Sequence, residues 1–482
     1  MATRALGTGL VLAIGLASAV VALPVAHAAP RSAPAPVSDF NGDGYADVAF
    51  AAPGAAVGAI KGAGYVGVAY GSKSGVQSSA KTVFTQNSPG IPDDAEAGDA
   101  FGSAVVSADL DRDGYTDLVV GSKGEQVGAT KWAGSLTVVW GGKDGLSGGA
   151  TLLNGNEYDD LGEHLTTGDF NGDGAPDIVG LRDSNVQLLT GPFKRSGESA
   201  GATEYPDLQD MVYLDVAAGD LDADGDDELV AVVFSTDDGD DRAIFVRNGG
   251  SAGLAAEPAS VKGGNGRELE GGEHLAVGHL DSDRYADLAV GRALDGQDSD
   301  LENPLAKGGM VTVVPGGAKG PQGAKAKVFN QDSPGVPGAA ESYDRFGSSL
   351  AIGDTDGDGN AELAVGVPFE TLGTVQRAGG LVVLRGTPNG PTGTGSYGFN
   401  QGTPDVTGAV EAGDFFGGAA DLRDLNGDGR ADLTVGAPGE NKDEGSLWVF
   451  PAGASAKGSF SFGHGTLGTT PAKAELGTSF DR

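Results

Sequence analysis

A nine-residue acidic segment that recurs seven times constrains this chain more than any other feature of its sequence. The segments begin at residues 39, 109, 169, 220, 279, 354 and 424, so their average spacing is about 64 residues. In the second segment, Asp109, Asp111, Asp113 and Asp117 stand at positions 1, 3, 5 and 9, with Gly114 at position 6. A repeat of this length indicates one supersecondary unit per period, and it extends over residues 37–482.

Each repeat contains short apolar runs separated by turn residues. In the second repeat the runs are 101–108, 118–121, 135–140 and a segment near 151–153. Such runs with glycine-rich turns are typical of antiparallel strands, and no helical period interrupts them. The predicted fold is therefore all-β, a seven-bladed β-propeller of four-stranded antiparallel blades. A linear β-solenoid is the alternative, but its repeats are usually much shorter.

The two ends of the repeat region complement each other. The first repeat lacks the Phe-Gly strand that precedes the acidic segment elsewhere, whereas residues 475–480 read like the segment around Phe346 and Gly347. We therefore expect the C-terminal segment to form the innermost strand of blade 1, which would close the ring and leave no sheet edge open.

The acidic segments predict calcium sites. Side-chain oxygens at positions 1, 3, 5 and 9, together with the backbone carbonyl of position 7, surround one point, and oxygen-only coordination by six or more ligands suits Ca²⁺ better than Mg²⁺. An EF-hand is excluded, because Val120 occupies the place of its last glutamate in the second segment and strands flank the site. A solvated turn would be the ordinary interpretation of one such segment, but not of seven.

About six of the seven segments are predicted to bind Ca²⁺. The fifth segment, His279–Asp287, is doubtful, because His279 replaces the first acid and Arg284 replaces the glycine. The predicted ligands, segment by segment, are Asp39, Asn41, Asp43, Tyr45 and Asp47; Asp109, Asp111, Asp113, Tyr115 and Asp117; Asp169, Asn171, Asp173, Ala175 and Asp177; Asp220, Asp222, Asp224, Asp226 and Glu228; Asp354, Asp356, Asp358, Asn360 and Glu362; and Asp424, Asn426, Asp428, Arg430 and Asp432.

The composition excludes several classes of function. The 67 acidic and 31 basic residues give a net charge of −36, which disfavours binding to nucleic acid or to anionic lipid. The chain has no cysteine, so disulfides, thiolate zinc sites, thiol nucleophiles and iron–sulfur clusters are excluded.

The first 28 residues resemble a secretory leader. Arg4 precedes an apolar stretch over residues 5–24, and Ala26-His27-Ala28 has the small-x-small pattern of a cleavage site. We predict a signal peptide at 1–28, a Pro/Ala linker at 29–36 and a secreted, extracellular propeller at 37–482 with no membrane span in the mature chain. An uncleaved membrane anchor is the alternative.

Two motifs at the strand ends carry a family resemblance. Phe-Gly precedes the acidic segment at Phe101, Phe346 and Phe416, and a Gly-Ala-Pro-like sequence ends the following strand at Pro53, Pro368 and Pro438. In this order, around the acidic segment, they resemble the FG-GAP repeats of the integrin α-subunit N-terminal propeller, although blades 3, 4 and 5 have lost parts of the pattern. The resemblance implies seven blades, Ca²⁺ in the hairpin loops and a role in adhesion or ligand recognition.

No catalytic residue is predicted, and whether the chain is an enzyme stays open. Gly-x-Ser-x-Gly occurs around Ser147 and Ser199, but both segments fall at glycine turns rather than at the strand-to-helix turn of hydrolases. An exported, esterase-like hydrolase, or a binding module attached to one, is the alternative function. His164 and His274 hold matching places on predicted innermost strands and could line a central channel.

The predicted function is recognition of an extracellular protein or carbohydrate by a monomeric propeller. Three long connections begin alike, with Gln-Asn-Ser-Pro-Gly, Gln-Asp-Ser-Pro-Gly and Gln-Gly-Thr-Pro-Asp, and they cover Gln86–Asp99, Gln331–Arg345 and Gln401–Asp414. Long connections on a rigid scaffold are favoured places for binding, so these are the candidate recognition surface. They could equally be plain connections between outer and inner strands.

Overall fold

The computed structural model describes Met1 and residues 38–482, except for 78, 183–184, 207, 209–210, 237–241, 296–306, 452 and 454. The predicted signal peptide and linker therefore lie outside the described residues, apart from Met1. The described residues from 38 onward belong to one compact unit. Within the described part of the chain, no helix is long and apolar enough to cross a membrane.

The described residues form seven antiparallel sheets, numbered here as blades 1 to 7. Six sheets have four strands and blade 1 has three. Short helices are α1 (Glu440–Asp443), α2 (His464–Leu467) and a 3₁₀ turn (Gly323–Lys325). The strands, blade by blade, are β1 (Val48–Ala52), β2 (Tyr65–Ala69) and β3 (Lys81–Phe84); β4 (Phe101–Ala108), β5 (Asp117–Ser122), β6 (Ser135–Val139) and β7 (Gly149–Asn154); β8 (Leu165–Gly168), β9 (Asp177–Arg182), β10 (Asn185–Thr190) and β11 (Gly201–Tyr205); β12 (Met211–Gly219), β13 (Glu228–Ser235), β14 (Arg242–Arg247) and β15 (Ala259–Ser260); β16 (His274–Gly278), β17 (Asp287–Arg292), β18 (Met310–Val314) and β19 (Lys327–Phe329); β20 (Leu350–Gly353), β21 (Glu362–Val367), β22 (Gly380–Arg385) and β23 (Thr392–Phe399); and β24 (Ala419–Arg423), β25 (Asp432–Ala437), β26 (Ser446–Phe450) and β27 (Phe460–Phe462).

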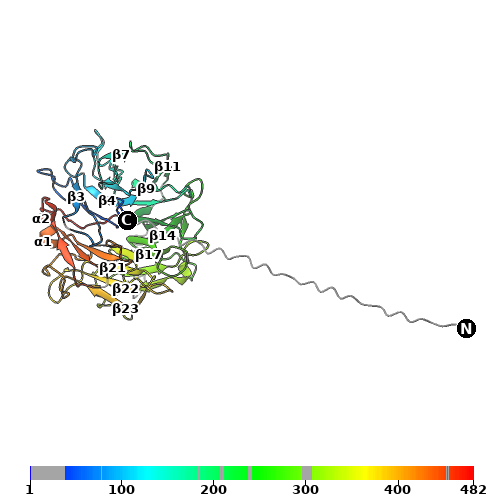
Figure 1. The fold of residues 1–482 in the computed structure, drawn as a ribbon. Coiled ribbons are helices and arrows are strands. Elements are labelled where there is room, and N and C mark those ends of the chain that lie inside the picture. Colours follow the sequence, from blue (N-terminus) through cyan, green and yellow to red (C-terminus); the bar gives the residue numbers. More distant parts are fainter. Residues whose placement is uncertain are drawn as a thin grey trace. The chain divides into compact units, whose positions relative to one another are not determined.

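The blades are arranged around a common centre (Figure 1), so the predicted all-β, seven-bladed propeller is confirmed. The inner strands of successive blades contact one another, for example β4 with β8, β8 with β12, and β16 with β20. Because neighbouring strands are antiparallel, the connections leave the ring at two ends. We call the end with the acidic segments and glycine turns the hairpin face (residues 109–117 and 141–145 in blade 2), and the other end the seam face (residues 123–134 and 155–164).

The apolar cores lie between the blades rather than inside them. Seven clusters of buried side chains each combine residues from two neighbouring blades. Phe101 of blade 2, for instance, packs with Val66 of blade 1, and Val449 of blade 7 packs with Phe50 of blade 1, which completes the ring. Every blade therefore needs both neighbours to bury its two faces.

Burial on both faces explains the composition of the central strands. All residues of β1, β2, β5 and β6 are buried, and apolar residues stand at consecutive positions in them, as in Val48–Ala52 and Leu118–Val120, instead of alternating strictly with polar ones. The outermost strand β11 has only its last residue buried and carries polar residues. The proportion of apolar residues in a strand thus indicates whether the strand is central or outermost in its blade.

Blade 1 lacks an innermost strand of its own, and the C-terminal segment lies beside β1. The backbone N–H of Ala51 donates to the carbonyl of Ser479 at 3.1 Å, and the N–H of Asp481 donates to the carbonyl of Ala49 at 3.2 Å. Only an isolated bridge, between Phe50 and Phe480, is formed here instead of a regular strand. The segment therefore covers the inner edge of β1 by a few hydrogen bonds.

The last two residues also carry a polar network into the middle of the ring, where Figure 1 places the C-terminus. The carboxylate of Asp481, with no exposed side-chain surface, pairs with Arg423 at 2.7 Å and accepts a hydrogen bond from Ser38 at 2.7 Å. The guanidinium of Arg482 pairs with Asp215 of β12 at 2.8 Å. Residues 481 and 482 thereby connect blades 1, 4 and 7.

Deleting residues 475–482 is expected to lower the free energy of unfolding by at least about 5 kcal/mol, far more than loss of an ordinary tail. The deletion leaves Arg423 buried without one of its carboxylate partners, which costs about 3 kcal/mol, and it opens cavities where Leu476 and Phe480 were, at about 2 kcal/mol or more each. Denaturant unfolding of the deletion and of Asp481→Asn measures this. An unchanged midpoint in both variants would refute the role of the segment.

Candidate cation sites and a surface pocket

In blades 2 to 7 the acidic segment is a hairpin loop between the first and second strands of the blade, and in blade 1 it directly precedes β1. The first-position carboxylate organises the loop by accepting backbone hydrogen bonds, as Asp109 does from Asp113 and Gly114, both at 3.0 Å. The backbone N–H of the seventh residue donates to the fifth-position carboxylate, from Tyr115 to Asp113 at 3.1 Å. The bond from the seventh-residue N–H to the fifth-position carboxylate recurs in five other segments, where the donors are Tyr45, Ala175, Asp226, Asn360 and Arg430.

The ninth-position acid is buried in all seven segments. In blade 2, Asp117 accepts backbone hydrogen bonds from Leu110 at 2.9 Å and from Gly141 at 2.8 Å. One carboxylate thus ties the hairpin to the glycine turn beside it on the hairpin face. The other buried ninth-position acids, each bonded to the N–H of the second residue of its own segment, are Asp47, Asp177, Glu228, Asp287, Glu362 and Asp432.

Carboxylate oxygens converge in the second, fourth and sixth segments. Oxygens of the first, third and ninth residues lie within 4.8 Å of one another there. In two of these segments the third-position oxygen, Oδ1 of Asp111 and of Asp222, is buried and has no hydrogen-bond partner among the described residues. A buried oxygen without a donor, set among other carboxylates, fits a hard cation that accepts oxygen ligands only.

The first, third and seventh segments carry asparagine at the third position. The side-chain oxygens of Asn41, Asn171 and Asn426 each accept the N–H of the fifth residue at 2.9 Å. A neutral amide lowers the number of carboxylates per site but still supplies an oxygen, so these loops keep a donor set of the same kind.

Burial changes the protonation of the ninth-position acids in the absence of a cation. It raises the pKa of Asp47 to about 8, and that of Asp117 and Glu228 to about 7. Neighbouring acids in the same loop add to the shift, because like charges disfavour ionisation. A bound divalent cation would reverse both effects.

Two arginines near the acidic segments were not anticipated from the sequence. Arg195, in the glycine turn of blade 3, pairs with Asp111 at 2.7 Å and Asp113 at 2.5 Å. Arg385, at the end of β22, pairs with Asp356 at 2.7 Å and Asp358 at 3.0 Å. In the second and sixth segments a guanidinium therefore already neutralises part of the charge, and it would share these carboxylates with a cation.

The fifth segment differs as its sequence suggests. The imidazole Nδ1 of His279 lies 3.0 Å from the carbonyl oxygen of Tyr285, the seventh residue, whose carbonyl is a ligand position in the pattern. The guanidinium of Arg284 lies 5.0 Å from the ring centre of Tyr285. Carboxylates of Asp281, Asp283 and Asp287 still converge within 4.8 Å, so cation binding at this segment stays an open prediction.

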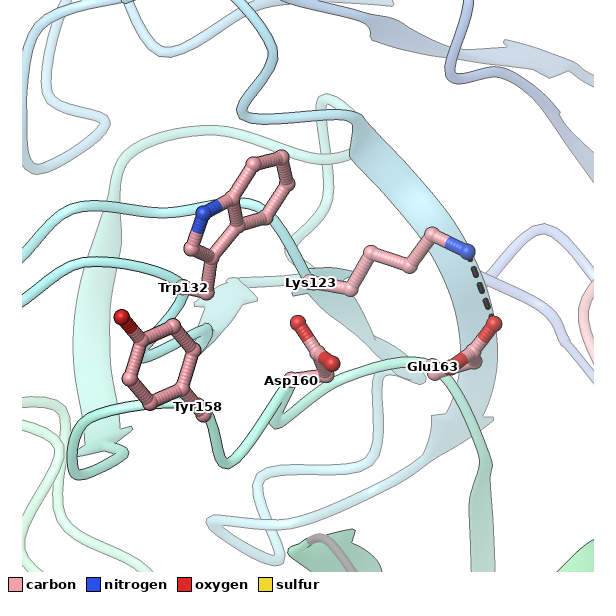
Figure 2. Close-up of a pocket in the computed structure, with 5 residues that line it drawn as sticks. All are labelled: Lys123, Trp132, Tyr158, Asp160 and Glu163. Carbon is pink, nitrogen blue, oxygen red and sulfur yellow. Dashed lines mark hydrogen bonds and ion pairs between the residues drawn. The ribbon is translucent and has the colours of Figure 1, made fainter.

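A surface pocket of about 370 Å³ lies on the seam face between blades 2 and 3. Its lining residues are Lys123, Trp132, Tyr158, Asp160 and Glu163. Figure 2 shows the two aromatic side chains on one side, Asp160 in the middle, and the Lys123–Glu163 ion pair of 2.7 Å on the other side. The volume is in the range of small-ligand sites, and aromatic faces beside charged groups suit an amphipathic ligand.

Both aromatic side chains of the pocket are exposed and have a left-handed backbone. Trp132 has a φ of 52° and Tyr158 a φ of 66°, with 52% and 62% of their surfaces exposed. When the repeats are aligned, Gly62 stands at the place of Trp132 and Gly98 at the place of Tyr158, also with positive φ. The sequence signal for this pocket is a pair of aromatic residues at positions where other repeats carry glycine or a basic residue, and the pocket was not predicted from it.

The hydrolase-like serines lie in turns. Ser199 falls between the antiparallel strands β10 and β11, and its hydroxyl donates to the carbonyl of Gly201 at 3.0 Å. Ser147 lies likewise between β6 and β7. His164 and His274 are brought close to Asp215, and burial lowers the pKa of His274 to about 4. The turns are not the strand-to-helix elbow that exposes a catalytic serine.

Comparison with known proteins identifies the repeats. The FG-GAP repeat family matches residues 31–69, 101–139, 346–384 and 416–450, and the FG-GAP-like repeat family matches 169–231. The chain is an FG-GAP repeat propeller. Integrin alpha-5 of Xenopus laevis is 40% identical over 101 residues, which is 20% of this chain and 9% of that protein.

A second relative of the FG-GAP chain is the phosphatidylinositol-glycan-specific phospholipase D. The Mus musculus protein is 28% identical over 195 residues, 40% of this chain and 22% of that protein. The Bos taurus protein is 33% identical over 147 residues, 30% of this chain and 17% of that protein. The alignments thus span less than a quarter of the length of these relatives.

The FG part of the FG-GAP pattern connects neighbouring blades. Phe346 and Phe416 have no exposed surface, and each forms a parallel bridge to a glycine of the preceding blade, Gly309 and Gly379. The glycine that follows has a positive φ, 101° at Gly347. Leucine takes the same place in two further bridges, Leu161 with Gly134 and Leu476 with Gly445.

Calcium is expected to raise the melting temperature of the FG-GAP propeller, and Asp222→Asn should reduce the rise by the contribution of one site. A site saturated at a hundred times its Kd contributes about 2.7 kcal/mol. Thermal melts in calcium and in EDTA measure the difference for each variant. Asp283→Asn tests the doubtful fifth segment: we expect it to leave the rise unchanged, and an equal reduction by both variants would show that the fifth segment also binds calcium.

In EDTA, the free energy of unfolding is expected to fall as pH rises from about 4 to about 8. The buried acids have raised pKa values in the folded chain, about 8 for Asp47, against about 4 in the unfolded chain. The folded chain then binds more protons than the unfolded chain, so stability is lost as pH rises through the folded values. Calcium should abolish this trend. Melting temperatures that rise with pH in EDTA would contradict the expectation.

Proposed function

We propose that this chain is a secreted, calcium-binding propeller that recognises an extracellular protein or carbohydrate at its seam face. The proposal combines the leader-like residues 1–28, the acidic hairpins and the pocket between blades 2 and 3. Adhesion through an FG-GAP propeller is also the role that the integrin resemblance suggests.

The pocket aromatics are the observation that carries the recognition role. A non-glycine residue in the left-handed region costs about 1–2 kcal/mol, and an exposed tyrosine gains little packing in return. Gly98 and Gly413 occupy the same repeat position as Tyr158, and an added Cβ would meet no atom within 4 Å at either. The fold therefore accepts glycine there. Tyr158 differs from the equally exposed Tyr343 in lining a pocket together with Trp132, and we assign it a ligand contact for that reason.

Calcium would act on the scaffold and not on the ligand. The hairpin face and the seam face are opposite ends of the same strands, so the predicted sites lie away from the pocket. Bound Ca²⁺ would neutralise converging carboxylates such as Asp220, Asp222 and Glu228, which otherwise repel one another. Ligand binding should then depend on calcium through the rigidity of the blades.

An exported hydrolase is the weaker candidate. Ser199 lies in an antiparallel turn and its hydroxyl is engaged by a backbone carbonyl. The alignment to the Mus musculus phospholipase D spans 22% of that protein, so its activity does not transfer to this chain. A binding module that serves a separate hydrolytic protein remains compatible with the proposed function.

Retention of the purified chain on polysaccharides, cell-wall material and matrix proteins tests the proposal. We expect selective retention in calcium that is lost in EDTA and lost in Trp132→Gly and Tyr158→Gly. Both variants introduce the residue of another repeat at a left-handed position, so their stability should stay within about 1 kcal/mol of the parent chain.

Tyr343→Gly is the matched control, because Tyr343 holds the same repeat position on another seam and is 62% exposed with a φ of 74°. It should leave retention unchanged. Retention that survives both pocket variants would place the ligand elsewhere, and ester turnover abolished by Ser199→Ala would favour the hydrolase.

A further inference from the structure

A second set of acidic residues lies on the seam face, away from the hairpins. Oxygens of Glu96, Asp99 and Glu125 lie within 4.8 Å of one another. Glu96 and Asp99 belong to the long connection between blades 1 and 2, and Glu125 belongs to the β5–β6 connection of blade 2. Asp99 and Glu125 are 2% and 1% exposed, whereas Glu96 is exposed to solvent.

A buried amide is directed into the same cluster. Gln86, which is 3% exposed, donates from Nε2 to Glu125 at 2.5 Å. Its Oε1 has no hydrogen-bond partner, nor has Oε1 of Glu125, and both atoms are buried. Oε1 of Glu125, a buried oxygen without a donor that belongs to a carboxylate converging with two others, calls for a proton or a cation, because leaving such a group unpaired is costly.

Neighbouring negative charges act on the cluster in addition to burial. Burial raises the pKa of Asp99 to about 6 and that of Glu125 to about 7, and Glu96 and Asp93 raise both further by repulsion. These groups must therefore bind protons or a cation when they are brought together.

Other seams, meaning the boundaries between neighbouring blades on the seam face, carry different residues at the positions equivalent to Asp99 and Glu125. Between blades 2 and 3, Asp159 takes the place of Asp99 and pairs with Arg182 at 2.8 Å. Between blades 7 and 1, both acids are replaced together, by Ala474 and Ala55, and both alanines are fully buried in one apolar cluster. In these two seams, therefore, the counterpart of Asp99 either pairs with an arginine or is replaced by alanine together with the counterpart of Glu125.

Two further seams have a buried glutamine that donates to a glutamate in the same way as Gln86 does, and we call this arrangement the acidic frame. Gln331 donates to Glu370 and Gln401 donates to Glu440, both at 2.6 Å, and Oε1 of each glutamine is again buried without a partner. Of the three frames, the one with Gln86 brings three carboxylates within 4.8 Å among the described residues. Recurrence at three seams marks the frame as a built feature rather than a chance contact.

We propose that Glu96, Asp99 and Glu125, with the buried amide of Gln86 beside them, bind a divalent cation of the calcium class at the seam between blades 1 and 2. The donor set is oxygen only, and the exposed Glu96 gives the ion access from solvent. The ion joins the long connection of residues 86–99 to blade 2, and so fixes a segment of the seam face that the hairpin sites do not reach.

Calcium binding to the metal-free full chain tests the proposal. The double variant Asp99→Ala with Glu125→Ala copies the alanine pair of the seam between blades 7 and 1, so the fold has a precedent for it. Equilibrium dialysis should show one calcium ion fewer per chain than the parent. In hydrogen exchange, calcium should no longer protect residues 87–98, while its protection of residues 109–117 persists.

Asp94→Asn is the matched control, since Asp94 is an exposed acid of the same connection, and it should leave stoichiometry and protection unchanged. Glu125→Gln, which keeps the size of the side chain, replaces the double variant if that variant does not fold. Unchanged calcium stoichiometry in the acid variants, with residues 87–98 still protected, would overturn the proposal and assign protons to the cluster instead.

Discussion

The buried carboxylate at the ninth position of each acidic segment is the interaction on which the blades depend. Asp117 accepts N–H groups from its own hairpin and from the neighbouring glycine turn, so one side chain fixes two connections at once. Asp287 keeps this role in the segment that has lost its first acid and its glycine. The ninth acid is therefore part of the fold even in the segment whose cation binding is doubtful. In the second, fourth and sixth segments the converging carboxylates include it.

The net charge of −36 is tolerated because acids are placed where something can compensate them. Some accept backbone hydrogen bonds, some pair with arginines such as Arg195 and Arg385, and others converge on positions that suit a cation. The apolar cores between blades supply the remaining cohesion without any contribution from charge. Electrostatics thus decides the conditions under which the ring is stable, and apolar packing decides its architecture.

The repeat predicted most of the fold, because strand runs and acidic segments recur at nearly constant spacing and each has a local physical cause. The regular C-terminal strand was not formed, although Ser479 and Asp481 bond to β1. Contacts between distant segments could not be predicted in this way: Arg195 meets Asp111 across a blade boundary, and Gln86 meets Glu125 only once blade 2 is in place. The pocket was missed because Trp132 and Tyr158 lie in connections, where no periodicity constrains side chains.

The seven apolar interfaces are alike in kind, and the interface between blades 7 and 1 also contains Leu476 and Phe480 of the C-terminal segment. The interruption of the ring lies inside blade 1, where this segment is held to β1 by hydrogen bonds and not by a hairpin. A covalent connection between the first and second strands of a blade is consequently dispensable. A gene rearranged to join the present ends and to open such a connection in another blade, a circular permutation, should encode the same ring with its interrupted blade moved to a new place.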